Sequence, residues 1–257
     1  MHAFFGPLDR ARLLCFIRCA MKRFYESADH APAENVPAVT ETGGHVVLLD
    51  GKPIRTPSRV QLVVPTEALA VAIAAEWDAQ GEKIDPATMP MMTLAATALD
   101  RVVPQARAVA GDAATYAGSD LLCYRVADWP ELAEAQRSEW DPILDWAAEA
   151  YGARLVMTEG IMPVAQDNAA LMLFARALGR LDPFRLAAVH VMTTAMGSLV
   201  LALAVHEGRL APAEAFRLST LDERFQAERW GEDHEARERL DRLAREIDEA
   251  AAYLALL

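Results

Sequence analysis

The segment that most constrains the fold is residues 186–205, twenty consecutive residues with no Asp, Glu, Lys or Arg. A segment this long and apolar can span a membrane or form the buried centre of a helical domain. His190, Thr193, Thr194 and Ser198 interrupt it, alanine supplies much of its bulk, and no aromatic belt flanks it. We therefore predict a single buried central helix, closed by Gly208, and no insertion into a membrane.

The C-terminal half around this segment shows helical patterns almost throughout. Helix starts are predicted at Pro130, at Asp182 with Pro183, and at Pro212, because proline is favoured in the first helical turn and aspartate caps it. His190 lies in the apolar segment and is interpreted as a core histidine with a satisfied ring. Further helices are expected over residues 130–151, 166–178, 212–230 and 233–256.

The N-terminal part has a different pattern, with short alternating segments between turn residues. The glycines at 43 and 44 and the Asp50–Gly51 pair mark tight turns. A first strand is predicted over residues 22–27, and another from the alternation of Val60, Leu62 and Val64. The remaining strands of this small antiparallel sheet are expected at residues 39–41 and 45–49.

Helical segments follow the predicted sheet. Thr66 is expected to cap a helix that ends at Gly81, a second helix is expected over residues 89–102, and Pro104 separates it from a third. These patterns predict an α+β protein in two domains. We expect a mixed β/α domain over residues 21–120 and an all-α domain over residues 121–257.

Residues 1–20 are acid-poor and contain three arginines, Arg10, Arg12 and Arg18. They are interpreted as a leader or an upstream extension that is not part of the fold, which is expected to begin near Met21. Composition limits the function further. A net charge of −12 disfavours nucleic acid as a partner, and three cysteines provide no disulfide framework, as expected in a reducing compartment.

Motifs for nucleotide binding, nucleophilic catalysis and zinc binding are missing from the sequence, so no cofactor or metal is predicted. One dense acidic block lies near the C-terminus and includes Asp222, Glu223 and Asp233, followed by His234. Three readings of it stay open. It can cap and solvate a helix end, form a protein-binding patch, or serve a metal-dependent or acid/base enzyme centred on Glu223.

Five tryptophans lie mostly on predicted helix faces. Each is expected first in a core, although a tryptophan left on the surface would be a good anchor for a partner protein. They are Trp77, Trp129, Trp140, Trp146 and Trp230.

Seven segments in order resemble one family, the assembly chaperones that bind the α subunit of the F1-ATPase (the Atp12 family). The resemblance covers nearly all of residues 21–257. The segments are residues 48–57 (LLDGKPIRTP), 65–80 (PTEALAVAIAAEWDAQ), 89–100 (MPMMTLAATALD), 116–125 (YAGSDLLCYR), 140–147 (WDPILDWA), 197–205 (GSLVLALAV) and 221–233 (LDERFQAERWGED).

The resemblance implies a chaperone that holds unassembled F1 α subunit until the β subunit replaces it, without catalysis and without a cofactor. We expect a monomer that inserts into no membrane. The alanine- and arginine-rich composition and the lack of a clear transit peptide favour the bacterial cytoplasm, with the mitochondrial matrix as the alternative.

Masking a partner requires an exposed patch with an apolar centre and a charged rim. Two regions are predicted to bind the partner. The first is the C-terminal block Asp222, Glu223, Gln226, Trp230 and Asp233. The second is the turn with Asp50, Gly51 and Thr56.

Overall fold

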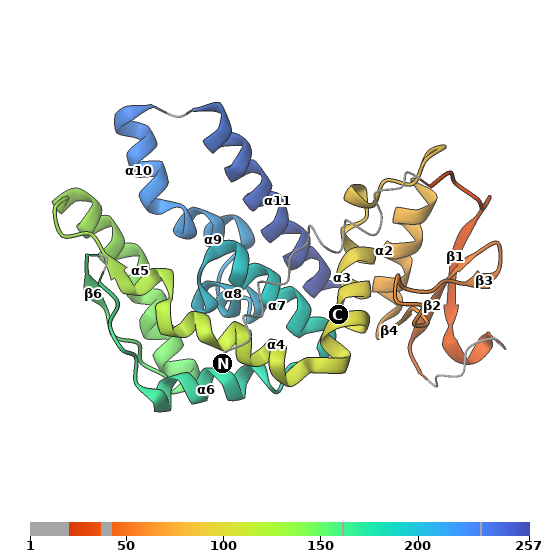
Figure 1. Ribbon diagram of the computed structural model, residues 1–257, viewed down its shortest axis with the longest axis horizontal. Coiled ribbons are helices and arrows are strands. Elements are labelled where there is room, and N and C mark those ends of the chain that lie inside the picture. The colour runs from red at the N-terminus through yellow and green to blue at the C-terminus, as the bar shows by residue number, and fades with distance from the viewer. Residues whose placement is uncertain (1–20, 37–42, 161, 232) are drawn as a thin grey trace, which may run out of the picture. The chain divides into compact units, whose positions relative to one another are not determined.

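The computed structural model describes residues 21–36, 43–160, 162–231 and 233–257. The expected leader, residues 1–20, and the expected strand at 39–41 lie outside the described residues. A small antiparallel sheet near the N-terminus is followed mostly by helices, which confirms the α+β class (Figure 1).

Two compact units divide the chain. One runs to Pro104 and includes Ala255–Leu257, and the other is Gln105–Leu254. The division falls inside helix α4 (Val103–Thr115), where Gln105 has the non-helical angles φ −143° and ψ 34°. The predicted domains, residues 21–120 and 121–257, are defined by independent folding, whereas these units are defined by compactness. The domain boundary near residue 120 therefore stays a prediction.

The sheet of the first unit is built on strand β2 (His45–Leu49). Strand β1 (Ala28–Pro32) pairs with its whole length, and β3 (Lys52–Pro53) and β4 (Val63–Val64) pair with its two ends, all antiparallel. The predicted strand at 22–27 is wrong, because the backbone amide of Arg23 bonds the carbonyl of Glu82 and only Lys22 makes a bridge, to Lys83.

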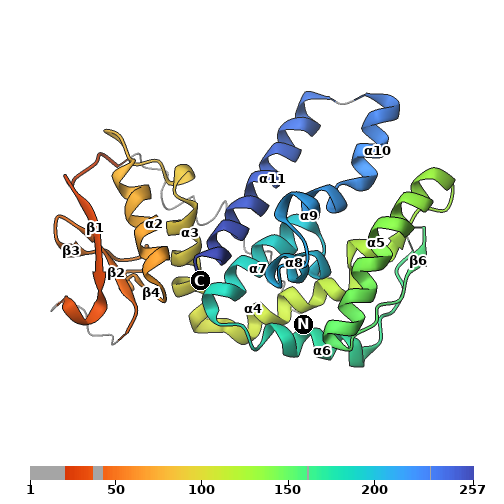
Figure 2. The ribbon, with the colours of Figure 1, turned by 180° about the vertical axis from the view of Figure 1, so that it is seen from behind.

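The predicted alternation at residues 60–64 is also wrong. Leu62, Val63 and Val64 are all buried, whereas Val60 is exposed. Only Val63 and Val64 form a strand, and Val63 is buried in a small cluster with Ala33 and Val46. Helix α2 (Glu67–Asp78) packs against β1, β2 and β4 (Figure 2).

Helix α2 begins as predicted, since the Thr66 hydroxyl accepts a hydrogen bond from the amide of Leu69 at 3.2 Å. The helix ends at Asp78, short of the expected Gly81. Helix α3 (Pro90–Thr97) has no cap of its own, so the carboxylate of Glu76 on α2 accepts from the amides of Met91 and Met92 at 2.7 and 2.8 Å. A π-helical turn, Ala98–Val102, continues α3 into the start of α4. The helical angles break at Gln105, directly after Pro104, so the helix that follows is separated near Pro104 as predicted.

The second unit is helical apart from one short parallel pair, β5 (Tyr124–Arg125) with β6 (Thr158–Glu159). Helix α8 lies at its centre and packs against α5, α7 and α9. The helices of this unit after α4 are α5 (Pro130–Tyr151), α6 (Asn168–Leu178), α7 (Pro183–Met196), α8 (Leu199–His206), α9 (Pro212–Ser219), α10 (Leu221–Trp230) and α11 (His234–Ala255).

The expected single helix over 186–205 is in fact two helices, α7 and α8. Gly197 takes the left-handed value φ 64° and ends α7, and the Ser198 hydroxyl caps α8 by accepting from the amide of Leu201 at 3.0 Å. Residues 199–205 are buried. None of the helices in the described residues combines the length and apolarity that crossing a membrane requires.

The expected helix over 212–230 also divides, at Thr220, into α9 and α10. The angles of Thr220, φ −112° and ψ 15°, leave the helical region. His190 is a buried core histidine as predicted, with its Nε2 2.9 Å from the Asp112 carboxylate.

A fully buried carboxylate, Asp120, holds the break between α7 and α8. It accepts from the Ser198 hydroxyl at 2.7 Å, the amide of Val200 at 3.0 Å and the amide of Leu122 at 3.1 Å. Burial nevertheless raises the pKa of Asp120 from 3.8 to about 6, and these hydrogen bonds offset the effect only in part.

This shifted pKa predicts a pH-dependent stability. Between the unfolded pKa of 3.8 and the folded pKa of about 6, the folded state holds a proton that the unfolded state has lost. The contribution of Asp120 to the free energy of unfolding therefore falls by about 3 kcal/mol as pH rises through this window. Urea unfolding of wild type and D120N across the window should show this fall in the wild type alone. The exposed substitution D128N should keep the wild-type profile, and parallel profiles for all three would contradict the assignment.

Candidate protein-binding site

Helix α10 is held on the second unit by polar and aromatic contacts. Of its ten residues only Leu221 is buried. Asp222 and Phe225 are partly buried, and Gln226 and Trp230 are exposed. A helix with so little buried apolar surface depends on its individual contacts with neighbouring elements, and those contacts define the candidate site.

The first contact is a polar network between α10 and α5. The amide nitrogen of Gln136 on α5 donates to the Asp222 carboxylate at 2.7 Å, and its amide oxygen accepts from the backbone N–H of Val126 at 2.9 Å. Gln136 is 0% exposed. The guanidinium of Arg125 donates to the backbone carbonyl of Gln136 and to the Asp141 carboxylate, each at 2.7 Å. The network thus ties α10 to α5 and β5.

Asp222 is a partly desolvated carboxylate in this network. Burial raises its pKa, while the hydrogen bond from Gln136 and the charge of Arg125 act in the opposite direction. Arg125 forms its ion pair with Asp141. Within the described part of the chain, Gln136 is the one hydrogen-bond donor to Asp222, so the carboxylate can still accept from a partner protein.

The second contact is an aromatic cluster. The ring of Trp129, just before α5, meets Trp230 edge-on at 5.4 Å and Phe225 at 6.2 Å. The Arg229 guanidinium lies over Trp129 and Phe225 and also pairs with Glu131. Trp230 remains 65% exposed despite these contacts. A large ring that packs against an aromatic neighbour and stays mostly exposed is a ready anchor for a partner protein.

The remaining residues of the predicted C-terminal block lie at the junction of α10 and α11. Glu223 forms an ion pair with Arg239 of α11, and Asp233 caps α11 by accepting from the amide of Ala236 at 2.7 Å. The structure thus places Asp222, Glu223, Gln226 and Trp230 on one helix and Asp233 at the start of the next. Their contact with a partner stays a prediction.

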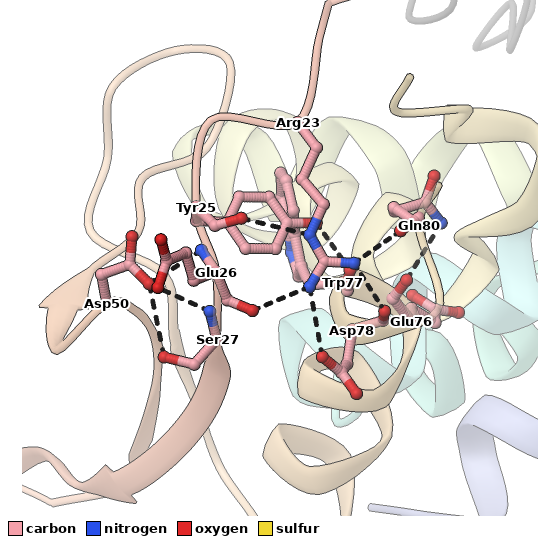
Figure 3. Close-up of polar contacts among 9 residues, drawn as sticks. All are labelled: Arg23, Tyr25, Glu26, Ser27, Asp50, Glu76, Trp77, Asp78 and Gln80. Atoms are coloured by element: carbon pink, nitrogen blue, oxygen red, sulfur yellow. Dashed lines mark hydrogen bonds and ion pairs between the residues drawn. The ribbon is translucent and has the colours of Figure 1, made fainter. Parts of the chain in front are cut away.

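The predicted turn residues lie in the first unit, where they serve the fold. Asp50 and Gly51 have φ values of 47° and 75° and join β2 to β3. The Asp50 carboxylate accepts from the amides of Glu26 and Ser27, both at 3.0 Å, and these hydrogen bonds lower its pKa (Figure 3).

Thr56 is buried, and its hydroxyl donates to the Asp100 carboxylate at 2.6 Å and accepts from the amide of Val60 at 3.1 Å. These intramolecular bonds account for Asp50 and Thr56, and the positive φ in the turn accounts for Gly51. A role in partner binding stays a prediction for all three.

A hollow of about 540 Å³ lies beside Arg23 and Tyr25 in the first unit. Arg23 is already committed to protein atoms there. Its guanidinium donates to the carbonyls of Asp78 and Gln80 at the end of α2, at 2.9 and 2.6 Å, and to the carbonyl of Glu26 at 3.0 Å (Figure 3). Arg23 therefore fastens the N-terminal segment to the C-terminal end of α2.

Gln136, Arg125 and Trp129 complete the candidate site, although the sequence patterns did not select them as site residues. Gln136 sits 86 positions from its partner Asp222. Of these three, only Trp129 could have been selected from the sequence by its residue type, because aromatic rings are common at binding surfaces. Among the described residues, no three His, Cys, Asp or Glu side chains are placed together to hold a metal ion.

Comparisons with known proteins identify consistent relatives. Residues 22–148 match the family model described as ATP12 chaperone protein. The mitochondrial protein atp12 of Schizosaccharomyces pombe is 24% identical, over 91% of this chain and 87% of that protein.

Solved structures are more similar in sequence. Atp12 from Paracoccus denitrificans, solved also as an aspartate-to-lysine variant, is 42% identical with a TM-score of 0.85, covering 91% of this chain and 97% of the other. The Atu1473 protein of Agrobacterium tumefaciens is 43% identical with a TM-score of 0.84, covering 91% and 85%.

The Gln136 network predicts a large loss of stability when its side chain is removed. Gln136→Ala leaves the amide of Val126 and the carboxylate of Asp222 without their partner, and should lower the free energy of unfolding by about 3 kcal/mol. The exposed Gln226→Ala on α10 is the matched control and should change it by less than about 0.5 kcal/mol. Urea denaturation followed by tryptophan fluorescence measures both, and equal effects would contradict the network's role.

Proposed function

The chain belongs to the ATP12 chaperone family, whose members act in ATP synthase assembly, and from this premise we propose that it binds the unassembled α subunit of the F1-ATPase. It covers the interface of that subunit until the β subunit replaces it. An unassembled subunit exposes apolar surface that its neighbours later bury, and such surface drives self-association. A chaperone that occupies the surface lowers the concentration of the exposed form.

The exposed Trp230, packed against Trp129, is the observation that carries this proposal. It supplies an apolar centre, and the carboxylates of Asp222 and Glu223 on the same helix supply part of a charged rim. This arrangement is typical of protein-binding surfaces. The contacts that hold α10 are polar and aromatic, so a partner can reach Trp230 without opening a hydrophobic core.

We further propose that the protein acts by binding alone, as its membership of a chaperone family implies. The alternative of an enzyme centred on Glu223 has weaker support. The Glu223 carboxylate pairs with Arg239, and the ring of His234 lies 3.5 Å from Glu238. The two side chains thus engage different partners instead of meeting at a shared site.

Its place of action and its assembly state are part of the same proposal. We favour a monomer in the bacterial cytoplasm, with the mitochondrial matrix as the alternative. Relatives occur in both settings, since two of the solved structures come from Paracoccus denitrificans and one relative is a mitochondrial protein of Schizosaccharomyces pombe.

Isolated F1 α subunit provides the direct test. The purified protein should suppress light scattering by α subunit diluted from denaturant, and should co-purify with it until β subunit is added. An unrelated acidic protein of similar size serves as the control. Failure of both assays with protein whose circular dichroism is helical would overturn the proposal.

Trp230 predicts a separable effect on binding. Trp230→Ala should weaken the affinity for isolated α subunit at least about tenfold, because a central exposed tryptophan is a typical binding hot spot. The free energy of unfolding should change by no more than about 1 kcal/mol, since the ring is 65% exposed. Isothermal titration calorimetry measures the affinity. Phe24→Ala, at a ring 62% exposed in the first unit, is the matched control and should bind as the wild type does.

A further inference from the structure

Three exposed apolar side chains gather in one short segment of the second unit. Val156, Met157 and Met162 are 46%, 51% and 72% exposed. We name these three residues the methionine loop. Exposed apolar side chains that cluster, unlike single scattered ones, mark places where other molecules bind. Methionine adapts to partners of different shape because its side chain is unbranched and polarizable.

The methionine loop is held in place by hydrogen bonds. The Gln166 side chain accepts from the Val156 amide at 2.7 Å and donates to the Val156 carbonyl at 2.8 Å. The parallel pairing of β5 with β6 places Thr158 and Glu159 beside Tyr124 and Arg125. Val156 and Met157 are therefore presented from a backbone fixed on both sides, which lowers the entropy that binding must overcome.

Side-chain contacts connect the methionine loop to Asp222. The sulfur of Met157 accepts from the Arg125 guanidinium at 3.4 Å, and Arg125 donates to the carbonyl of Gln136 at 2.7 Å. Gln136 in turn donates to Asp222 at 2.7 Å. Strand β6 runs beside α5 in Figure 1. The contacts through Arg125 and Gln136 connect it with α10, so the loop and Asp222 belong to one region of the second unit.

The charges around Arg125 do not balance. Asp141, Asp222 and Glu159 provide three carboxylates, and Arg125 already donates to Asp141 and to the carbonyl of Gln136. The neighbouring Arg137 pairs with Glu134. An acidic region of this kind attracts a cation from a partner and disfavours an acidic partner.

We propose that the methionine loop and Asp222 form one docking surface, and that it takes a partner segment carrying an apolar side chain close to an arginine or lysine. The apolar side chain packs against Val156, Met157 and Met162, and the cation meets Asp222. This inference rests on the proposed function and deepens it, because it names the chemistry of the client segment that binds.

Its test uses the full-length chain with a double variant, V156S/M162S, and a control, V71S. Val71 on α2 is 45% exposed, close to the 46% of Val156, but lies in the first unit. Circular dichroism establishes that each variant is folded. The probes are isolated F1 α subunit, a synthetic peptide of alternating leucine and arginine, and the matching leucine–glutamate peptide.

We expect the double variant to bind the α subunit and the leucine–arginine peptide at least about tenfold more weakly than wild type. V71S should bind as wild type does. D222N should lose most of the wild-type preference for the arginine peptide over the glutamate peptide, and added salt should weaken that preference.

The outcomes separate the two proposals. Wild-type affinity of the double variant for α subunit would overturn the docking surface and leave the chaperone function intact. The wild-type protein could instead bind the leucine–arginine peptide through the methionine loop and fail to bind α subunit. That result would support the docking surface and overturn the proposal that α subunit is the client. A wild-type protein that binds neither probe would overturn both.

Discussion

The fold of the second unit depends on one buried carboxylate, Asp120, at the break between α7 and α8. Ser198 and the amide of Val200 both donate to it, and the amide of Leu121 bonds the carbonyl of Gly197. The unpaired amides at the start of α8 thereby find acceptors inside the core, where water cannot supply them. The break lets an apolar segment of twenty residues pack as two short helices, and α8 then provides the surface on which α5 and α9 assemble.

This apolar centre contrasts with the way in which α10 is attached. Helix α8 is buried from Leu199 to Val205, whereas α10 buries Leu221 alone. The attachment of α10 relies on Gln136 and on the rings of Trp129 and Phe225, and each of these contacts also shapes the candidate site. The core sets the positions of α5 and α9, and the polar and aromatic contacts set which side chains face outward.

Local signals in the sequence predicted most helix starts, because capping depends on a few neighbouring residues. Thr66, Asp182 and Pro130 begin helices as expected. Ser198 and Thr220 are also residue types that cap helices. The break at Ser198 was missed because the apolar segment continues through it, and the break at Thr220 because the helical pattern continues through it. The candidate site was only partly predictable. Trp230 and Asp222 stood out by residue type, whereas Gln136 and Met157 acquire their roles from partners far away in the sequence.

The character of the proposed surface suits a partner that must later be released. A surface of aliphatic residues as well packed as a core would hold the client with an affinity that a competing subunit could not overcome. Methionine side chains, an exposed tryptophan and a carboxylate with one internal donor take much of their binding strength from complementarity to the client. A subunit that buries more of the same client surface can therefore displace the chaperone without any input of chemical energy.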